Sequence, residues 1–406
     1  NFMIGNINGI LSAFGSRGRL SVLKLTLPLG ISFYTFQSVS YVVDVYRGKH
    51  EPQKNFFKYA LFVSFFPQLL QGPIGRYEQL YEGHAYDLKN IQFGLQRILW
   101  GMLKKMVLAD RVNAAVTLIF NNYWNYGGWI NVFGVILYSI QLYADFSGGI
   151  DITIGIAQMF GITMDENFRQ PYFSRSISEF WRRWHITLGT WMKDYIFYPF
   201  SLSRCMNKFG KWCKKTFGNN VGKLLPVSLA NLLVFFIVGI WHGAAWKYIM
   251  YGMYNGVIIA ASGMLAPVYA RIHESLHINP KSWWYQVFCI IRTFILVNIG
   301  FYFDMAPDLH AANVMLLDTV TKAHLSQISM ATVKAVGLTA QDLIIVAAGC
   351  IIIFVVSVLK EKGIKIRETV ASRNIVLRWF IYIVFIMFIL IYGSTSTTSD
   401  FIYANF

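Results

Sequence analysis

Long apolar stretches, separated by short polar ones, run through most of this chain. A helix that spans a bilayer needs about 20 mostly apolar residues, somewhat more or fewer when it is tilted. The segments that meet or approach that length are 22–45, 92–109, 129–146, 224–243, 246–270, 284–303, 342–359 and 375–392. This pattern predicts an all-α, polytopic integral membrane protein.

Shorter apolar pieces lie between these segments, at 56–72, 112–120, 150–163 and 177–200. They are too short or too interrupted for simple spans, and we expect them to be tilted, re-entrant or interfacial. Non-helical backbone persists at membrane depth only where protein buries it or where it lines a wet cavity. The short pieces therefore predict an internal chamber.

The basic residues predict an orientation in the membrane. Segment 201–223 holds six Lys and Arg residues and no acidic residue, and segment 360–378 is also basic. Cytoplasmic loops carry such an excess. Four predicted helices separate the two segments, so both should face the cytoplasm. The last helix then delivers the C-terminus to the outside, and loop 304–340 is external as well.

Composition agrees with a membrane location. Of the 406 residues, 55% are hydrophobic, 17% are aromatic and 14% are charged, whereas a soluble domain carries roughly 25% charged residues. The net charge of +16 could suggest nucleic acid. Because the basic residues cluster in short segments between apolar runs, we interpret the charge as topology and expect a lipid bilayer, not nucleic acid, as the partner.

The four cysteines do not form a recognisable disulfide or zinc-binding pattern. Cys289 and Cys350 lie inside apolar runs, and Cys205 and Cys213 share a lysine-rich loop without matching Cys or His partners. A disulfide or zinc site is the less favoured interpretation.

The sequence shows no repeat of fixed period and no low-complexity linker. Residues 1–406 are thus predicted to form a single transmembrane domain.

One of the eight histidines, His242, closes an apolar run in "FFIVGIWHGAAWKY". An ionisable residue at membrane depth is costly and usually faces a bundle interior or a water-filled cavity. Small residues beside it would let another backbone or a thin substrate approach: Gly239, Gly243, Ala244 and Ala245. The alternative is a structural role, in which His242 bonds a carbonyl between helices. Six other histidines fall in predicted loops, where a solvated side chain is expected: His50, His84, His273, His277, His310 and His324.

The remaining histidine, His185, lies in "EFWRRWHITLGTW" at 179–191, among two arginines and three tryptophans. On one continuous helix, four side chains would form a single stripe: Trp181, His185, Leu188 and Met192. The stretch therefore predicts an aromatic wall that carries one imidazole.

A basic patch accompanies that wall. Glu179 lies three and four residues before Arg182 and Arg183, a spacing that allows ion pairs on a helix. The arginines could extend to lipid phosphates. They could equally steer an anionic donor such as a coenzyme or a phosphopantetheine group. The residues alone leave both roles open.

Two buried histidines suit acyl transfer. A neutral imidazole can take a proton from a hydroxyl and return it to a leaving thiolate, while a second can orient the acceptor or bind the developing oxyanion. Metal binding is the competing chemistry. The sequence has neither HxxxH nor HExxH, and carboxylates would have to be recruited from afar: Asp145, Asp151, Glu179 and Asp194. We predict no metal site.

Several stretches together resemble the membrane-bound O-acyltransferases. They are "LPLGISFYTFQSVSYVVDVYRG" at 27–48, "FPQLLQGPIGRYEQL" at 66–80, "QLYADFSGGIDITIGIAQMFG" at 141–161, "ENFRQPYFSRSISEFWRRWHITLGTWMKDYIFYPF" at 166–200, "GIWHGAAW" at 239–246 and the closing "FIYANF". The sequence is most similar to the bacterial branch that contains the alginate O-acetylation and teichoic-acid D-alanyl transfer membrane proteins.

The resemblance implies a ring of about 8–11 spanning or re-entrant helices around a thin central funnel or tunnel. It implies that His242 is the principal catalytic residue and that His185 fills the second active-site position. We expect further residues to bind substrate: Trp181, Trp184, Arg182, Arg183, Asn167 and Trp241. Family members usually carry additional N-terminal spans, so we expect that such spans precede residue 1 in the full-length protein.

The resemblance also implies an activity. We expect O-acetylation of an exported polysaccharide, with acetyl-CoA as the donor, no bound cofactor, and an extracytoplasmic partner of the serine-esterase type that completes the transfer. Two alternatives remain: D-alanyl transfer to teichoic acid from a carrier protein, and a non-enzymatic transporter with structural histidines.

Overall fold

The computed structural model describes residues 2–14, 20–21, 30–69, 71–81, 87–327, 329–393 and 401. Within these residues the chain is helical, and the β-structure is confined to one isolated bridge between Phe168 and Trp184. Together with the long apolar helices, this confirms the predicted all-α membrane fold.

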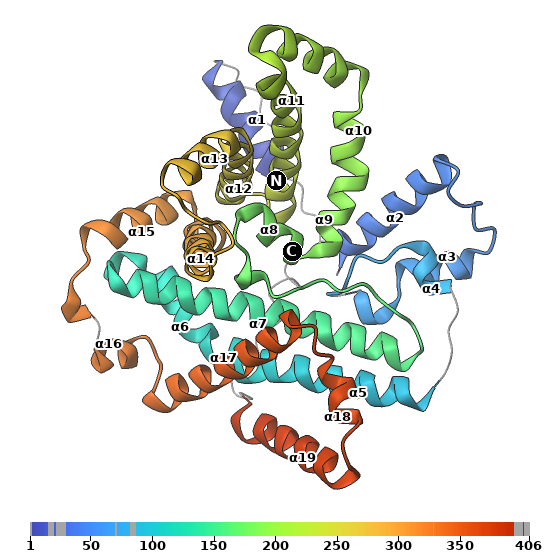
Figure 1. The fold of residues 1–406 in the computed structure, drawn as a ribbon, viewed down its shortest axis with the longest axis vertical. Coiled ribbons are helices and arrows are strands. Elements are labelled where there is room, and N and C mark those ends of the chain that lie inside the picture. Colours follow the sequence, from blue (N-terminus) through green and yellow to red (C-terminus); the bar gives the residue numbers. More distant parts are fainter. Residues whose placement is uncertain are drawn as a thin grey trace.

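The helices follow one another along the chain with short connections (Figure 1). The first nine are α1 (Phe2–Ala13), α2 (Ile31–Tyr46), α3 (Phe56–Val63), α4 (Tyr77–Tyr81), α5 (Leu88–Met102), α6 (Asp110–Asn121), α7 (Trp129–Met159), α8 (Ile177–Arg183) and α9 (Ile186–Met192). The others are α10 (Tyr198–Ser201), α11 (Arg204–His242), α12 (Trp246–Met264), α13 (Ala266–Ser275), α14 (Trp283–Met305), α15 (Leu309–Thr321), α16 (Met330–Ala335), α17 (Ala340–Glu361), α18 (Ile366–Ala371) and α19 (Ile375–Tyr392).

Short 3-10 and π-helical turns complete the secondary structure. The 3-10 turns are η1 (Phe66–Gln68), η3 (Tyr123–Asn125), η4 (Pro171–Phe173) and η6 (Leu325–Gln327), and the π-helical turns are η2 (Leu103–Ala109) and η5 (Lys193–Phe197). Because η2 joins α5 directly to α6, the chain continues as one irregular helical rod from Leu88 to Asn121.

Five helices among the described residues are long and apolar enough to cross a membrane. They are Trp129–Met159, Val221–His242, Trp283–Met305, Ala340–Glu361 and Ile375–Tyr392. Helices α12 and α13, bent by 56° at their junction, add a sixth if they form one span. These correspond to six of the eight predicted spans.

The other two predicted spans differ from expectation. Of segment 22–45, residues 22–29 lie outside the described residues, and the described part belongs to α2, which has 16 residues. Segment 92–109 contains two buried lysines, Lys104 and Lys105, in the turn η2. Neither α2 nor the α5–η2 rod is among the helices that qualify as spans by length and composition. Of the closing "FIYANF", residues 402–406 are likewise not described.

Helix α7 is the centre of the molecule (Figure 1). In the apolar stretch of α7 that is long enough to cross a membrane, 67% is buried inside the protein, whereas in the corresponding stretch of α19 only 6% is buried. Glycine explains how closely α5 packs on α7: a Cβ at Gly94 would lie 2.5 Å from the carbonyl oxygen of Gly155, and one at Gly101 would lie 2.5 Å from that of Gly148. Small residues allow such backbone contact between helices in a membrane.

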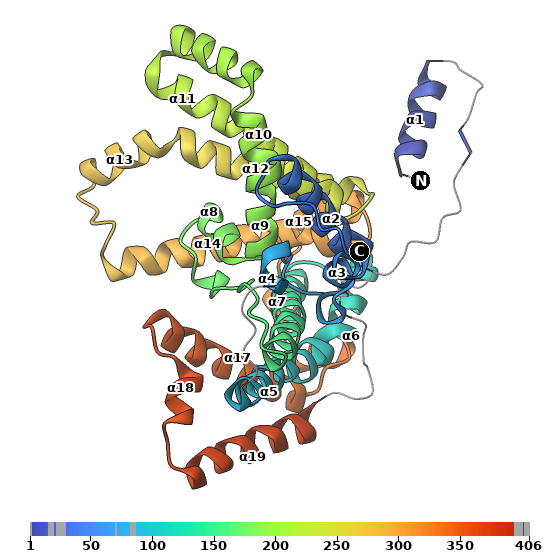
Figure 2. The same cartoon turned by 90° about the vertical axis from the view of Figure 1, so that its right-hand side faces the viewer.

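The two basic segments lie along the same side of the molecule. Figure 2 shows the first half of α11, the helix α13 and the helix α18 along one side. That this side is cytoplasmic, and that the C-terminus is extracytoplasmic, remain predictions.

Candidate active site

His185 sits at a break in the chain, not on a continuous helix. Helix α8 ends at Arg183 and α9 begins at Ile186. His185 itself has φ 47° and ψ 53°, a left-handed conformation that is uncommon outside glycine. The predicted uninterrupted helix through 179–191 is thus wrong. Trp184 is extended instead and pairs with Phe168 in the isolated bridge.

Asn167 holds this break together. Its backbone carbonyl accepts a hydrogen bond of 3.0 Å from the Ile186 N–H. Its side-chain Oδ1 accepts hydrogen bonds of 3.0 Å from both the N–H and the hydroxyl of Thr187, and lies 3.3 Å from Nδ1 of His185. Asn167 is fully buried. Backbone strain is maintained where the surroundings fix it, and Asn167 supplies that constraint.

Despite the break, the four residues of the predicted stripe line one cavity. Trp181, His185, Leu188 and Met192 all border a space of about 540 Å³ between α8, α9 and the middle of α11. The turn between α8 and α9 redirects the chain, and the stripe survives because both short helices present these side chains to the same space.

The two arginines of the predicted basic patch, Arg182 and Arg183, have different surroundings. Arg183 pairs with Glu179 at 3.0 Å, as predicted, and also with Glu361. Arg182 borders the cavity. The second partner of Glu179 is Arg175.

Trp184 also lies away from the cavity. It is 2% exposed and packs in the main hydrophobic core, with its ring stacked on Phe180 at a centroid distance of 5.4 Å. Trp181 differs, because its indole N–H bonds the Asn255 side chain while its ring borders the cavity.

His242 ends α11 where that helix crosses α12. A Cβ at Gly239 would lie 2.6 Å from the carbonyl oxygen of Tyr248, and one at Gly252 would lie 2.2 Å from that of Phe235. The small residues were expected to admit either another backbone or a thin substrate, and the structure shows the backbone of the neighbouring helix α12. This close crossing buries His242, which is 4% exposed.

The ring of Trp241 contacts both histidines. Its ring centroid is 5.7 Å from that of His185 and 5.0 Å from that of His242. His242 also contacts Tyr251 edge-on, at a centroid distance of 5.4 Å. Residues 57 positions apart in sequence therefore share one buried aromatic cluster.

A carboxylate that the sequence did not reveal lies beside His242. Oδ1 of Asp304, near the end of α14, is 3.8 Å from Nδ1 of His242. The other oxygen, Oδ2, accepts a hydrogen bond of 2.7 Å from the hydroxyl of Tyr138. Lys247 caps the end of α14 by donating to the backbone carbonyls of Asp304 and Ala306. The only signal available was its position, directly after the predicted span 284–303.

Burial governs the chemistry of His185. It is 2% exposed, and helices α8 and α9 lie outside the candidate spans. Burial lowers its pKa well below the usual 6.5, and nearby His242 acts in the same direction. The imidazole is therefore neutral at pH 7, the form that can accept a proton.

The carboxylates that a metal would need are engaged elsewhere. Asp145 pairs with Lys105 at 2.7 Å and Asp194 pairs with Arg76 at 3.0 Å. Across the described ranges, no three His, Cys, Asp or Glu side chains are grouped closely enough to hold a metal ion.

Comparison with known proteins places the chain in a family. The model of the membrane-bound O-acyltransferase family matches residues 53–303. The chain is 34% identical over 320 residues to a probable alginate O-acetylase AlgI of Pseudomonas syringae, covering 78% of this chain and 56% of that protein. It is 31% identical to a peptidoglycan O-acetyltransferase of Helicobacter pylori, covering 80% and 63%. It is 28% identical to a teichoic acid D-alanyltransferase of Bacillus subtilis, covering 70% and 69%.

The match leaves a large part of the relatives unaccounted for, since the chain spans little more than half the length of the Pseudomonas syringae protein. The family model nevertheless covers both histidines, Asn167 and Trp241. The family match over residues 53–303, the similarity to the Pseudomonas syringae protein and the long apolar helices all point to the same family. This multi-pass membrane protein therefore belongs to the membrane-bound O-acyltransferase family.

Proposed function

We propose that this chain is a membrane O-acyltransferase that moves an acetyl group from a cytoplasmic thioester toward an exported polysaccharide. The support is twofold. Relatives named alginate O-acetylase and peptidoglycan O-acetyltransferase are 34% and 31% identical to it. The observation that carries the proposal is the buried pair of histidines that both contact Trp241.

In the proposed reaction His242 is the general base. Its imidazole takes the proton of the acceptor hydroxyl as the oxygen forms a bond to the thioester carbonyl carbon. The tetrahedral intermediate collapses by breaking the carbon–sulfur bond, and the imidazolium returns the proton to the thiolate. Asp304, 3.8 Å from Nδ1, stabilises the imidazolium between the two proton transfers.

His185 is assigned an orienting role. Donation from its Nδ1–H to Asn167 Oδ1, at 3.3 Å, leaves Nε2 as an acceptor, which can hold a hydroxyl but cannot stabilise an oxyanion. Of the two roles considered for a second histidine, this geometry favours orientation of the acceptor. Asn167 is then a positioning residue for His185, and its own Nδ2, buried without a hydrogen-bond partner in the described part of the chain, is a candidate substrate contact.

The cavity beside His185 is the proposed donor site. Trp181 and Val238 provide apolar and aromatic walls, while Arg182 and Lys193 contribute positive charge. Such a lining suits a thioester whose carrier group bears phosphates, and acetyl-CoA is the donor we favour. Transfer is proposed to be completed by an extracytoplasmic partner of the serine-esterase type, whose serine would be one possible acceptor.

The test uses purified protein in detergent and acetyl-CoA labelled in the acetyl group. We expect release of free coenzyme by the wild type and a loss of about 10²-fold or more in His242→Ala, since general base catalysis contributes roughly 10²–10⁴-fold. His185→Ala should lose less. The matched control is His310→Ala, which removes an exposed histidine on α15. Wild-type release by His242→Ala would contradict the proposal.

D-alanyl transfer to teichoic acid is the second candidate, favoured by the 28% identity to the Bacillus subtilis D-alanyltransferase. A parallel reaction with a D-alanylated carrier protein distinguishes the two. Turnover of that donor but not of acetyl-CoA would select this candidate, and turnover of acetyl-CoA alone would remove it.

A further inference from the structure

A second cavity lies on the other side of the chain segment that holds His185. It has a volume of about 440 Å³ and opens between α5 and α7 on one side and α17, α18 and α19 on the other. Glu166, Phe168 and Gln170 border it, whereas Asn167 between them turns toward His185. The active-site chemistry proposed above uses none of the side chains that line this second cavity.

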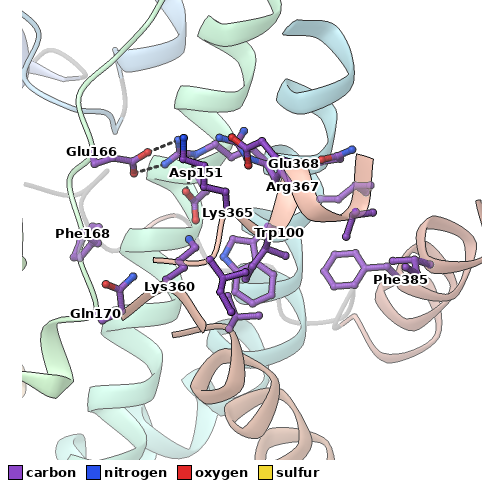
Figure 3. A pocket seen from close by; sticks show the side chains of 18 of the residues that line it. Trp100, Asp151, Glu166, Phe168, Gln170, Lys360, Lys365, Arg367, Glu368 and Phe385 are labelled. Atoms are coloured by element: carbon purple, nitrogen blue, oxygen red, sulfur yellow. Dashed lines mark hydrogen bonds and ion pairs between the residues drawn. The ribbon is translucent and has the colours of Figure 1, made fainter. Parts of the chain in front are cut away.

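The lining is positively charged. Five basic and three acidic side chains border the cavity, which gives a net charge of +2. Arg97 neutralises two of the carboxylates, through hydrogen bonds of 2.9 Å to Asp151 and 2.7 Å to Glu166 (Figure 3). The third carboxylate is Glu368.

Three of the cations have no such partner. In the ranges that the structure describes, no carboxylate lies within ion-pair distance of Lys360, Lys365 or Arg169. Figure 3 shows Lys360 extending into the middle of the space, between Phe168 and Trp100. A cation held over a cavity in this way has positive charge to offer to a ligand.

The rest of the wall is apolar, with Leu99 and Trp100 on α5, Val356 on α17, and Ile381 and Phe385 on α19. α17 and α19 are both candidate spans, and α18 joins the ends at which they leave the membrane. Two spans joined in this way would place the basic end of the cavity at the depth of lipid headgroups, with its apolar wall toward the acyl chains.

From this arrangement we propose that the second cavity binds an anionic phospholipid. The phosphate lies against Lys360, Lys365 and Arg169, and an acyl chain lies along Trp100 and Phe385. Basic pockets between membrane helices are suited to such headgroups. Neither zwitterionic lipid nor an uncharged detergent supplies the net negative charge that this lining would neutralise.

The bound lipid would support the active site through one short segment. Phe168 pairs with Trp184, and the Arg169 N–H donates to the Arg183 carbonyl. A lipid that fixes Phe168 and Arg169 from one side therefore steadies the backbone on either side of His185. The binding claim itself is independent of the proposed reaction.

The experiment measures lipid binding and needs no activity. The delipidated protein is titrated in detergent with phosphatidylglycerol or phosphatidylcholine, and bound lipid is counted by native mass spectrometry. The pocket variant is Lys360→Gln with Lys365→Gln. The matched control is Lys362→Gln with Arg373→Gln, which removes the same charge from the same basic segment, 360–378, at positions outside the cavity.

We expect the wild type to prefer phosphatidylglycerol over phosphatidylcholine. Removal of each lysine should weaken that binding roughly fivefold, so the pocket variant, which lacks both, should bind about 25-fold more weakly. The control should stay within about twofold of the wild type. Equal losses in both variants would show a general charge effect and overturn the proposal, as would absence of any preference for phosphatidylglycerol.

Inorganic phosphate and coenzyme A distinguish the possible sources of the phosphate group. If neither displaces phosphatidylglycerol at millimolar concentration, the lipid is the ligand, as proposed. If either displaces it from the wild type but not from the pocket variant, the cavity takes a soluble phosphate compound and the lipid assignment is wrong.

Discussion

Replacing Asp304 by Asn tests the arrangement around His242 most directly. The substitution keeps the size of the side chain and an acceptor for the Tyr138 hydroxyl, but it removes the negative charge 3.8 Å from Nδ1. At an effective dielectric constant of about 20, a full charge pair at this distance is worth about 4 kcal/mol. The separation exceeds a hydrogen bond, so relaxation of the site will recover part of this.

We therefore expect Asp304→Asn to lower kcat by about 10²-fold, with KM for the thioester little changed, because the carboxylate acts on the imidazolium that forms during the reaction. Initial rates of coenzyme release measure both constants. Asp304→Glu should recover part of the rate. Asp318→Asn is the control, since it removes another buried carboxylate, one that pairs with Lys322.

A wild-type kcat in Asp304→Asn, from protein that elutes and melts as the wild type does, would refute this role. A loss of equal size in Asp318→Asn would attribute the effect to folding and would refute it as well.

Two further predictions concern stability. Gly252→Ala should destabilise the protein by about 1–3 kcal/mol, because the new Cβ would lie 2.2 Å from the Phe235 carbonyl oxygen. The control is Gly263→Ala on the same helix, which has nothing within 4 Å of the new Cβ and should melt no lower than the wild type. Equal melting temperatures for the two variants would contradict the tight crossing of α11 and α12. The lowered pKa of His185 predicts that its contribution to stability is complete above pH 6.5 and is lost as the pH falls below that value, since the unfolded chain binds the proton first. His185→Gln should therefore show a smaller fall in melting temperature between pH 7.5 and pH 5.5, and an unchanged fall would contradict burial of a neutral imidazole.

The sequence was a good guide to the fold class and to the burial of His185 and His242, because both depend on local composition. An apolar run of about 20 residues can only be buried in lipid or protein, and an imidazole at its end must have partners. The pairing of Glu179 with Arg183 followed from helix spacing in the same way.

The break at His185 could not be seen in that pattern. The periodicity of 179–191 fits a helix. The helix is interrupted because Asn167 and Phe168, from the preceding segment, bond to the backbone around Trp184 and Ile186. Tertiary contacts override local propensity here. Asp304 was missed for a related reason: its neighbours in sequence are apolar, and its importance comes from a histidine 62 positions earlier.

Segment 92–109 is not a simple membrane span because its two buried lysines form ion pairs with carboxylates inside the protein. Lys105 lies between Asp145 and Asp110 at 2.7 and 2.9 Å, and Lys104 bonds Asp151. Breaking such a buried pair costs roughly 3–5 kcal/mol, because the partner would be left as an uncompensated charge.

These lysines and carboxylates are therefore poorly suited to proton transfer, since any change in their protonation would be opposed by the fold itself. The histidines are not bound by that constraint. A neutral imidazole can be buried at modest cost. Of His185 and His242, only His242 has, among the described residues, a carboxylate within ion-pair distance that could stabilise the charge it would acquire during a reaction. Among the titratable groups around Trp241, the structure thus favours His242 as the residue whose charge changes and His185 as the one that remains neutral.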